Sequence, residues 1–225
     1  MITQLADTIR SSWKDLPNLS PLKVNPKFEK VYKDVDDEKL HIHNEVYQCT
    51  GLRKIHLEVA KLGMLDILHC IWYPDPKYNL PIFGADIVAN KSFVSAAITD
   101  LSPVGELTPM FNKISEISNK YKFEKERDMP GWGNIFSPYV KFMSLESQEE
   151  KDNFCSLVGE YLSVFAEEVK HSQIDVDGEQ SRLEGQINYC KQQKKNDKTR
   201  RILIKCFDEE WADQYINEIL FDEPN

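Results

Sequence analysis

The chain has 225 residues, 41% of them hydrophobic and 11% aromatic, and this composition suits one globular domain, which we expect to span residues 1–225. No run approaches about 18 consecutive apolar residues, and the chain does not open with a basic start followed by an apolar stretch. We therefore expect a cytoplasmic protein with neither a transmembrane helix nor a signal peptide. The formal net charge of −9 argues against nonspecific binding of nucleic acid.

The first predicted element is an amphipathic helix over residues 2–13, in which Ile2, Leu5, Ile9 and Trp13 recur at spacings of three and four. A region rich in β-branched and aromatic residues follows, made of short runs of which several alternate with a period of two. Consecutive runs of this kind with short connections predict an antiparallel meander. The runs span residues 40–43, 55–59, 66–72, 81–88 and 93–98.

The hydrophobic period changes to that of a helix after Ser147. A long helix is predicted there, with Ser147 as its N-cap and Glu149 and Glu150 as favourable acids in its first turn. We expect a further helix within residues 178–205, and a last one over residues 209–220 with an aspartate directly before it as N-cap. Strands in one block and helices in another predict an α+β fold.

The candidate catalytic residues are ionisable groups that interrupt the apolar strands. Residues 55, 57 and 59 are apolar and share one face of their strand, so His56 and Glu58 share the other face. His69 and Asp86 each lie within a run that is apolar on both sides. Burial lowers the pKa of a histidine and raises that of an aspartate, and a hydrogen bond between the two can let them share a proton near neutral pH. Such groups suit the donation of protons to a substrate that has gained an electron.

Two other interpretations of these four residues stay open. A single buried histidine or aspartate is more often structural, and two histidines with two carboxylates can also bind zinc or iron. The sequence has no compact ligand motif such as H-E-x-x-H to favour a metal. It also has no nucleotide or flavin fingerprint, and its five cysteines include no C-x-x-C pair. A redox enzyme of this sequence would take its electrons from another protein.

Charge is unevenly distributed along the chain. Seven lysines or arginines and a single aspartate lie between Cys190 and Cys206, which gives this segment a charge of +6 and the rest of the chain −15. The segment is either a docking surface for an acidic partner, an anchor for an anionic small molecule, or a solvated helix face.

Several sequence blocks, in order and with matching spacing, resemble the ferredoxin-dependent bilin reductase family, and within it the members that make phycocyanobilin. The resemblance runs through nearly the whole chain. The blocks are residues 53–58, 65–70, 80–88, 94–103, 132–137, 195–201 and 219–222. The resemblance implies a three-layer α/β/α sandwich with a central antiparallel sheet, and a bilin bound between the sheet and the C-terminal helices.

The resemblance also implies roles for individual residues. Asp86 would be the central proton donor to the bilin, and His69 would be the second proton-relay residue. Glu58 would serve reduction of the D-ring exovinyl group, with His56 in the water network behind His69. The propionates would be held by Arg127, Ser95 and Lys198, while Gln193, Asn196 and Trp132 would line or support the pocket.

The reaction implied by the resemblance is a four-electron, four-proton reduction of biliverdin IXα through bilin radicals. Reduced [2Fe-2S] ferredoxin supplies single electrons, and no permanently bound cofactor is needed. We expect the acidic ferredoxin to dock near residues 191–205. A phycobilin lyase or an apo-phycobiliprotein is a candidate acceptor of the product.

The product stays open between two phycobilins. Glu58 favours phycocyanobilin, but the sequence departs from the family pattern at Ala85, Ile202 and residues 90–93. A phycoerythrobilin-producing relative could keep the same motifs, because small changes of substrate pose decide which bond is reduced. A non-catalytic bilin carrier is a third reading, although the joint presence of His69, Asp86 and Glu58 argues against it.

Overall fold

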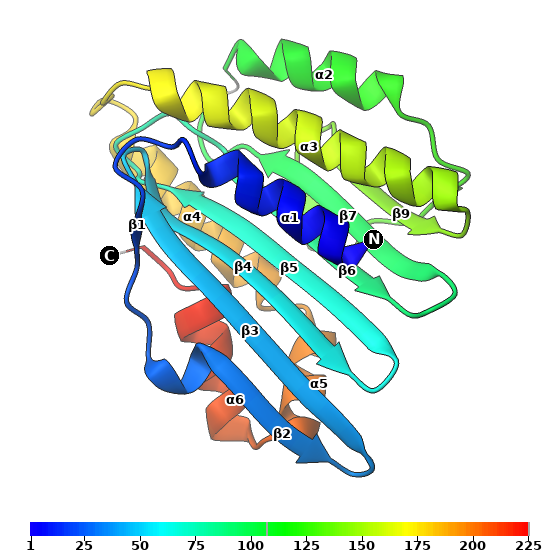
Figure 1. Ribbon diagram of the computed structural model, residues 1–225. Coiled ribbons are helices and arrows are strands. Elements are labelled where there is room, and N and C mark those ends of the chain that lie inside the picture. Colours follow the sequence, from blue (N-terminus) through cyan, green and yellow to red (C-terminus); the bar gives the residue numbers. More distant parts are fainter. Residues whose placement is uncertain (107, 225) are drawn as a thin grey trace.

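The core of the computed structural model, which describes residues 1–106 and 108–224, is a twisted antiparallel sheet of nine strands (Figure 1). The strand order is β1-β3-β4-β5-β6-β7-β9-β8, and β2 pairs with β3 beside this path. The predicted meander is thus confirmed for β3 to β7. The strands are β1 (Ser20–Pro21), β2 (Lys30–Val35), β3 (Glu38–Cys49), β4 (Leu52–Leu62), β5 (Leu65–Pro74), β6 (Ile82–Ala89), β7 (Val94–Ser102), β8 (Lys125–Glu126) and β9 (Lys141–Leu145).

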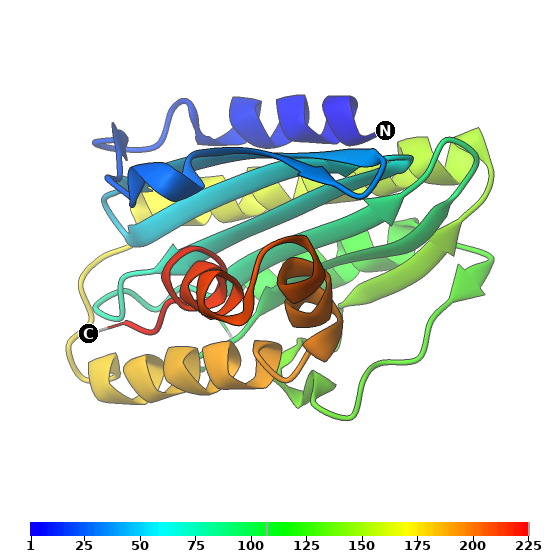
Figure 2. The same cartoon turned by 90° about the horizontal axis from the view of Figure 1, so that it is seen from below.

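Helices cover both faces of the sheet. The first layer contains α1 (Ile2–Trp13), α2 (Met110–Lys120) and α3 (Gln148–His171), and the second contains α4 (Glu179–Gln193), α5 (Asp197–Cys206) and α6 (Glu209–Tyr215), which continues as a π-helical turn, η3 (Ile216–Leu220). Figure 2 shows the sheet between the two layers. The predicted α/β/α sandwich is confirmed.

The alternation of side chains along each strand divides the apolar residues between two cores. One core joins the sheet to α1, α2 and α3, with Trp72, Phe83 and Phe165 at its centre. The other joins the opposite sheet face to the C-terminal helices, through Tyr73 and Tyr189 among others. The candidate residues belong to this second face, which we call the site face.

Several elements differ from the expectations. The expected single helix within residues 178–205 is two helices, α4 and α5, separated at Asn196, the N-cap of α5. The last helix is α-helical only to Tyr215, because its final residues form the π-helical turn. Helix α2 and strands β1, β2, β8 and β9 were not predicted. The caps of α3 and α6 at Ser147 and Asp208 are confirmed.

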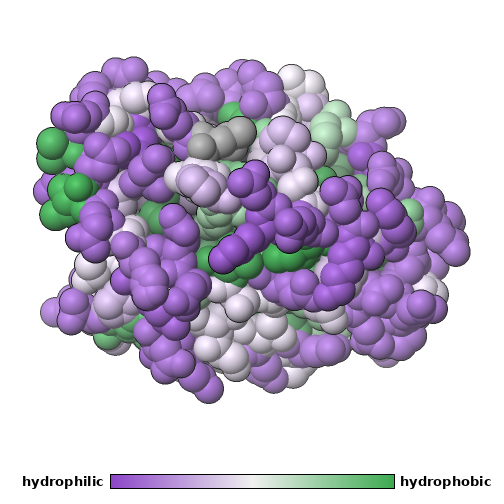
Figure 3. All heavy atoms as spheres, turned by 90° about the horizontal axis from the view of Figure 1, so that it is seen from above, coloured by the Kyte–Doolittle hydropathy of each residue, from purple (hydrophilic) through white to green (hydrophobic). Residues whose placement is uncertain are grey.

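The face of the molecule that lies at the top of Figure 1, on the side of α2, is mostly hydrophilic, with hydrophobic side chains in small patches (Figure 3). Among the residues that the structure describes, no helix combines the length and apolar character needed to span a membrane. All five cysteines are free thiols.

Candidate active site

Three of the predicted catalytic residues form a single row across neighbouring strands. Glu58 on β4 lies directly opposite His69 on β5, and His69 lies directly opposite Asp86 on β6. Asn44 on β3 extends the row beyond Glu58. Directly opposed residues of an antiparallel sheet point to the same face at about 5 Å between Cβ atoms, so the row gathers two carboxyl groups and an imidazole on the site face. His56 lies on the same face of β4, two residues before Glu58.

The register of these strands is fixed by short hairpins. The β4–β5 turn uses only Gly63 and Met64, and Gly63 has a φ of +56°. A Cβ atom at Gly63 would also meet the carboxylate of Glu38, so a larger residue here would need a left-handed backbone and a shift of that side chain. A slip of one residue in this hairpin would turn His69 to the opposite face.

Burial sets the protonation of the row. It raises the pKa of Asp86 to about 6. It raises the pKa of Glu58 to about 7, against a lowering effect of the hydrogen bond from Tyr215. The pKa of His69 falls to about 4, through burial first and the charge of Lys54 second. The pKa of His56 is also lowered well below its ordinary value, mainly by burial. Near neutral pH both imidazoles are therefore neutral, Glu58 is about half protonated, and Asp86 is protonated to a smaller extent.

Glu58 belongs to a buried hydrogen-bond network that the sequence did not reveal. The hydroxyl group of Tyr215, on α6, donates to the Glu58 carboxylate and accepts a 2.9 Å hydrogen bond from the Asn44 amide. The amide oxygen of Asn44 lies 2.8 Å from Nε2 of His56. Because the pKa of His56 is low, its ring is neutral and donates this bond from Nε2. The network joins α6 to the row and orients Glu58.

The two histidines retain free hydrogen-bonding capacity towards the site. Nδ1 of His56 and Nε2 of His69 are buried and have no hydrogen-bond partner among the described residues. The ring of Phe221 packs edge-on against His69 at 5.6 Å between centroids. Within the described part of the chain no hydrogen bond joins His69 to Asp86, so the pair does not share a proton in this arrangement. Unpaired buried nitrogens of this kind are available to a bound molecule or water.

The site face is incompletely covered beyond Asp86. On β6 the residues facing α3 are buried, whereas Gly84, Asp86 and Val88 on the site face are only half-buried. Ile98, opposite Asp86 on β7, is half-buried as well. The C-terminal helices thus leave a strip of the sheet accessible next to the central carboxyl group, and an extended apolar molecule could lie along it.

The predicted propionate-binding residues are split between two places. Arg127 donates to the backbone oxygen of Ser95 at 2.6 Å and lies over the ring of Phe142, so Arg127 and Ser95 meet at one end of the half-buried strip. The hydroxyl group of Ser95 donates to the backbone oxygen of Val88. Lys198 is exposed on α5, and the structure does not bring it into contact with Arg127.

The remaining predicted pocket residues lie in the second helix layer and the loop beside it. Gln193 ends α4 and donates from its amide to the hydroxyl group of Tyr189 at 2.9 Å. Asn196 is the N-cap of α5. Trp132 packs against the second core and lies 6.1 Å from Phe136 between ring centroids.

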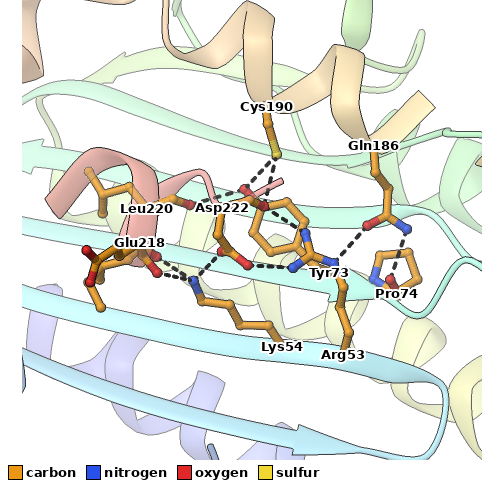
Figure 4. A network of polar contacts seen from close by, with 10 residues as sticks. Arg53, Lys54, Tyr73, Pro74, Gln186, Cys190, Glu218, Leu220 and Asp222 are labelled. Carbon is orange, nitrogen blue, oxygen red and sulfur yellow. Dashed lines mark hydrogen bonds and ion pairs between the residues drawn. The ribbon is translucent and has the colours of Figure 1, made fainter. Parts of the chain in front are cut away.

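A buried lysine, Lys54, lies on the site face of β4, two residues before His56. Figure 4 shows Lys54 and Arg53 of β4 converging on Asp222, near the end of the chain. Both cations form ion pairs with this carboxylate. A lysine inside an alternating strand is ordinarily read as solvated, and nothing in the sequence indicated its burial. In the ranges 1–106 and 108–224, no three His, Cys, Asp or Glu side chains are arranged to hold a metal ion.

Comparisons with known proteins agree with one another. Residues 6–222 match the family model described as ferredoxin-dependent bilin reductase. The chain is 49% identical to the phycocyanobilin:ferredoxin oxidoreductase of Synechococcus sp. (strain CC9902), over 100% of this chain and 93% of the relative. It is 43% identical to the protein of that name from Prochlorococcus marinus (strain MIT 9515), over 99% and 94%. The fold is similar to that of phytochromobilin synthase from tomato, crystallised in complex with biliverdin, with a TM-score of 0.83 at 16% identity over 100% and 85% of the two chains.

Proposed function

Because the chain belongs to the ferredoxin-dependent bilin reductases, a family of oxidoreductases, we propose that it reduces biliverdin IXα to phycocyanobilin with electrons from reduced ferredoxin. The observation that carries this proposal is the row of Glu58, His69 and Asp86 across three strands, beside a half-buried strip of the sheet. Relatives at 43 to 49% identity that are named phycocyanobilin:ferredoxin oxidoreductase support the choice of product.

The protein supplies protons and geometry. Four electrons arrive singly from ferredoxin, each electron raises the basicity of the bilin, and four protons must follow. Asp86, with a pKa of about 6, lies at the centre of the site face and is the proton donor to the bilin. His69, opposite Asp86, relays a further proton and is resupplied through the solvent network that His56 completes. A carboxyl group with a pKa near the working pH can both give up and regain a proton.

Glu58 determines which double bond is reduced. Its carboxyl group is protonated to a large extent near neutral pH, since its pKa is about 7, and the hydroxyl group of Tyr215 fixes its orientation. A donor held at a second point on the bilin can deliver protons to the exovinyl group as well as to the ring system. This two-donor arrangement supports phycocyanobilin over phycoerythrobilin as the product.

The propionates are bound by cations at the periphery. Arg127 and Ser95 bind one propionate at the end of the half-buried strip, and Lys198 of α5 approaches the other from the helix layer. Gln193, Asn196 and Trp132 line the side of the pocket that the C-terminal helices form. Lys198 then lies in the same basic segment that attracts ferredoxin, so the electron donor docks close to the substrate.

An anaerobic assay with biliverdin, ferredoxin and a reducing system tests the proposal. We expect the biliverdin absorbance to be lost with transient radical bands, and chromatography to identify phycocyanobilin. Phycoerythrobilin as the released bilin would contradict the product assignment while retaining the reductase. A stable complex whose spectrum does not change under reduction would identify a carrier instead. Loss of turnover on chelation would revive the metal-site interpretation.

A further inference from the structure

Lys54 is an ionisable group on the site face to which no role has been given so far. Only 2% of the residue is exposed, and it lies on β4 on the same face as His56, two residues away or about 7 Å along the strand. Its Nζ donates to the backbone oxygen of Ile219 at 2.7 Å and pairs with the carboxylate of Asp222 (Figure 4).

An apolar residue at this position would avoid a large desolvation cost. Moving an ammonium group out of water is unfavourable unless it is paired and fully hydrogen-bonded, and burial lowers the pKa of Lys54 accordingly. Arg53 already binds Asp222 through both its carboxylate and its backbone oxygen. The C-terminal segment therefore has one cationic anchor without Lys54, and the second, buried cation calls for a separate explanation.

The contacts of Lys54 fix the segment that covers His69. The carbonyl groups of Glu218 and Ile219 belong to the last turn of η3, where helix carbonyls lack partners and a positive charge is favourable. Tyr73 donates to the next carbonyl, that of Leu220, at 3.1 Å. Phe221 follows directly and packs edge-on against His69. Lys54 thus holds the turn that places an aromatic ring on a proton-relay histidine.

The positive charge of Lys54 also acts on both histidines. It is the largest electrostatic contribution, after burial, to the low pKa of His56 and to that of His69. The other ionisable groups that face His69 are Glu58 on β4, Asp86 on β6, and His56 beside Glu58, with Tyr215 of α6 behind Glu58. Of these groups and Lys54, the lysine is the one whose ion pair with a carboxylate, that of Asp222, favours its cationic form.

We propose that Lys54 is a positioning residue with two effects: its ammonium group anchors the C-terminal segment over His69, and its positive charge, held by the ion pair with Asp222, opposes protonation of His56 and His69. Protons that enter the site then bind the carboxyl groups of Asp86 and Glu58 rather than the imidazoles, until the substrate takes them. This meaning for catalysis rests on the proposed function, whereas the electrostatic effect does not.

Two substitutions separate the charge of Lys54 from its hydrogen bond. Lys54→Gln removes the charge but keeps a donor, and Lys54→Met removes both, while Arg53 still binds Asp222 in either variant. The matched control is Lys61→Met on the same strand, an exposed lysine that pairs with Asp66. The His69 ring is followed by NMR between pH 3 and 8 in the substrate-free protein with labelled histidine, and its signal is assigned with a His69→Gln variant.

We expect the pKa of His69 to rise from about 4 towards its ordinary value of 6.5 in both Lys54 variants, and to stay unchanged in the control. An unchanged midpoint in Lys54→Gln would overturn the electrostatic effect, even if Lys54→Met shifts, because only loosened packing would then be left. Hydrogen exchange of residues 216–222 should accelerate in Lys54→Met more than in Lys54→Gln, and equal protection in Lys54→Met and wild type would overturn the anchor. Neither readout needs turnover, so both stand apart from the assay of the proposed function.

Discussion

At the scale of single residues, the carboxyl groups of the site have raised pKa values, whereas the imidazoles have lowered ones. Asp86 and Glu58 have pKa values of about 6 and 7, while that of His69 lies near 4. The common cause is burial, which acts in opposite directions on acids and bases because it disfavours the charged form of each. Near neutral pH the carboxyl groups can therefore bind and release a proton, whereas the imidazoles stay neutral.

Asp86→Asn should retain bilin binding and lose turnover. Asparagine keeps the size and the hydrogen-bonding character of the side chain but cannot release a proton at this pH. We expect turnover to fall by about 10²- to 10⁴-fold, the range for removal of a general acid. Bilin titration by absorbance and the ferredoxin-driven assay measure the two effects separately. Turnover close to that of the wild type would show that Asp86 is not the donor.

Glu58→Gln should stabilise the fold at neutral and higher pH. The pKa of Glu58 is about 7 in the folded chain against an ordinary 4.5, so the folded state binds this proton more tightly than the unfolded state. The resulting stabilisation is complete below pH 4.5 and is lost as the pH rises through 7. Glutamine has no proton to lose, so the variant should gain up to about 3 kcal/mol over the wild type by pH 8.

Urea unfolding of both proteins at pH 5 and pH 8 measures this effect. The advantage of the Gln variant should be larger at pH 8. The same difference in free energy of unfolding at both pH values would mean that the carboxyl group of Glu58 titrates normally in the folded chain.

The sequence alone located the ionisable residues of the row, but not the residues that hold them in place. Alternation along a strand placed His56 and Glu58 on one face, because that pattern needs only local geometry. Tyr215 lies 157 residues from Glu58, and the contact depends on how α6 packs across the sheet. Lys54 was missed for another reason, since its burial depends on Asp222 at the far end of the chain. Long-range partners of this kind leave no periodic signal in a sequence.

At the scale of elements, the strongest local signals gave correct boundaries. The helix α3 begins with a complete capping box. The hydroxyl group of Ser147 accepts a hydrogen bond from the backbone N–H of Glu150, and the Glu150 carboxylate accepts one from the backbone N–H of Ser147. Helix α2 was missed although Met110, Phe111, Ile114 and Ile117 recur at helical spacing, and strand β9 is a run of only five residues. The division between α4 and α5 was missed as well, since α4 is a polar segment with a weak apolar stripe.

Ser147→Ala should cost about 1 kcal/mol of the free energy of unfolding, because it leaves a backbone donor of α3 without its partner. Ser163→Ala is the matched control, an exposed position within the same helix where alanine is the better helix former. Chemical unfolding should show a loss for the first variant and no loss for the second. A loss of the same size in both would mean that the cap contributes nothing specific.

At the scale of the whole molecule, ion pairs formed in the folded chain neutralise part of the positive charge of the basic segment, residues 191–205. Four of its seven cations form ion pairs, among them Lys194 with Glu223 and Lys205 with Asp36. Arg200 binds two carboxylates of α6, and Arg201 pairs with Asp197. Lys191, Lys195 and Lys198 form no ion pair with any residue in the described ranges, and the sequence could not show which of the seven charges would be neutralised.

Charge reversal of two of these lysines tests the docking surface for ferredoxin. Lys191 and Lys195 are exposed at the end of α4 and just after it, close in sequence to Lys198, for which we propose a propionate contact, but outside the proposed substrate contacts themselves. An acidic partner approaching a chain of net charge −9 needs a local positive field, and such fields raise association rates by 10-fold or more. Lys191→Glu with Lys195→Glu should therefore lower kcat/KM for ferredoxin by about tenfold at low salt, with bilin affinity unchanged.

Salt provides the internal check on this prediction, because screening weakens only the electrostatic part of association. Wild-type kcat/KM should fall as ionic strength rises, and the double variant should show a flatter dependence that meets the wild type at high salt. Lys113→Glu, an exposed lysine on α2 in the opposite helix layer, makes half the charge change away from the docking face and should keep the wild-type salt slope. If the control lost as much activity as the double variant, net charge rather than a defined face would govern ferredoxin binding.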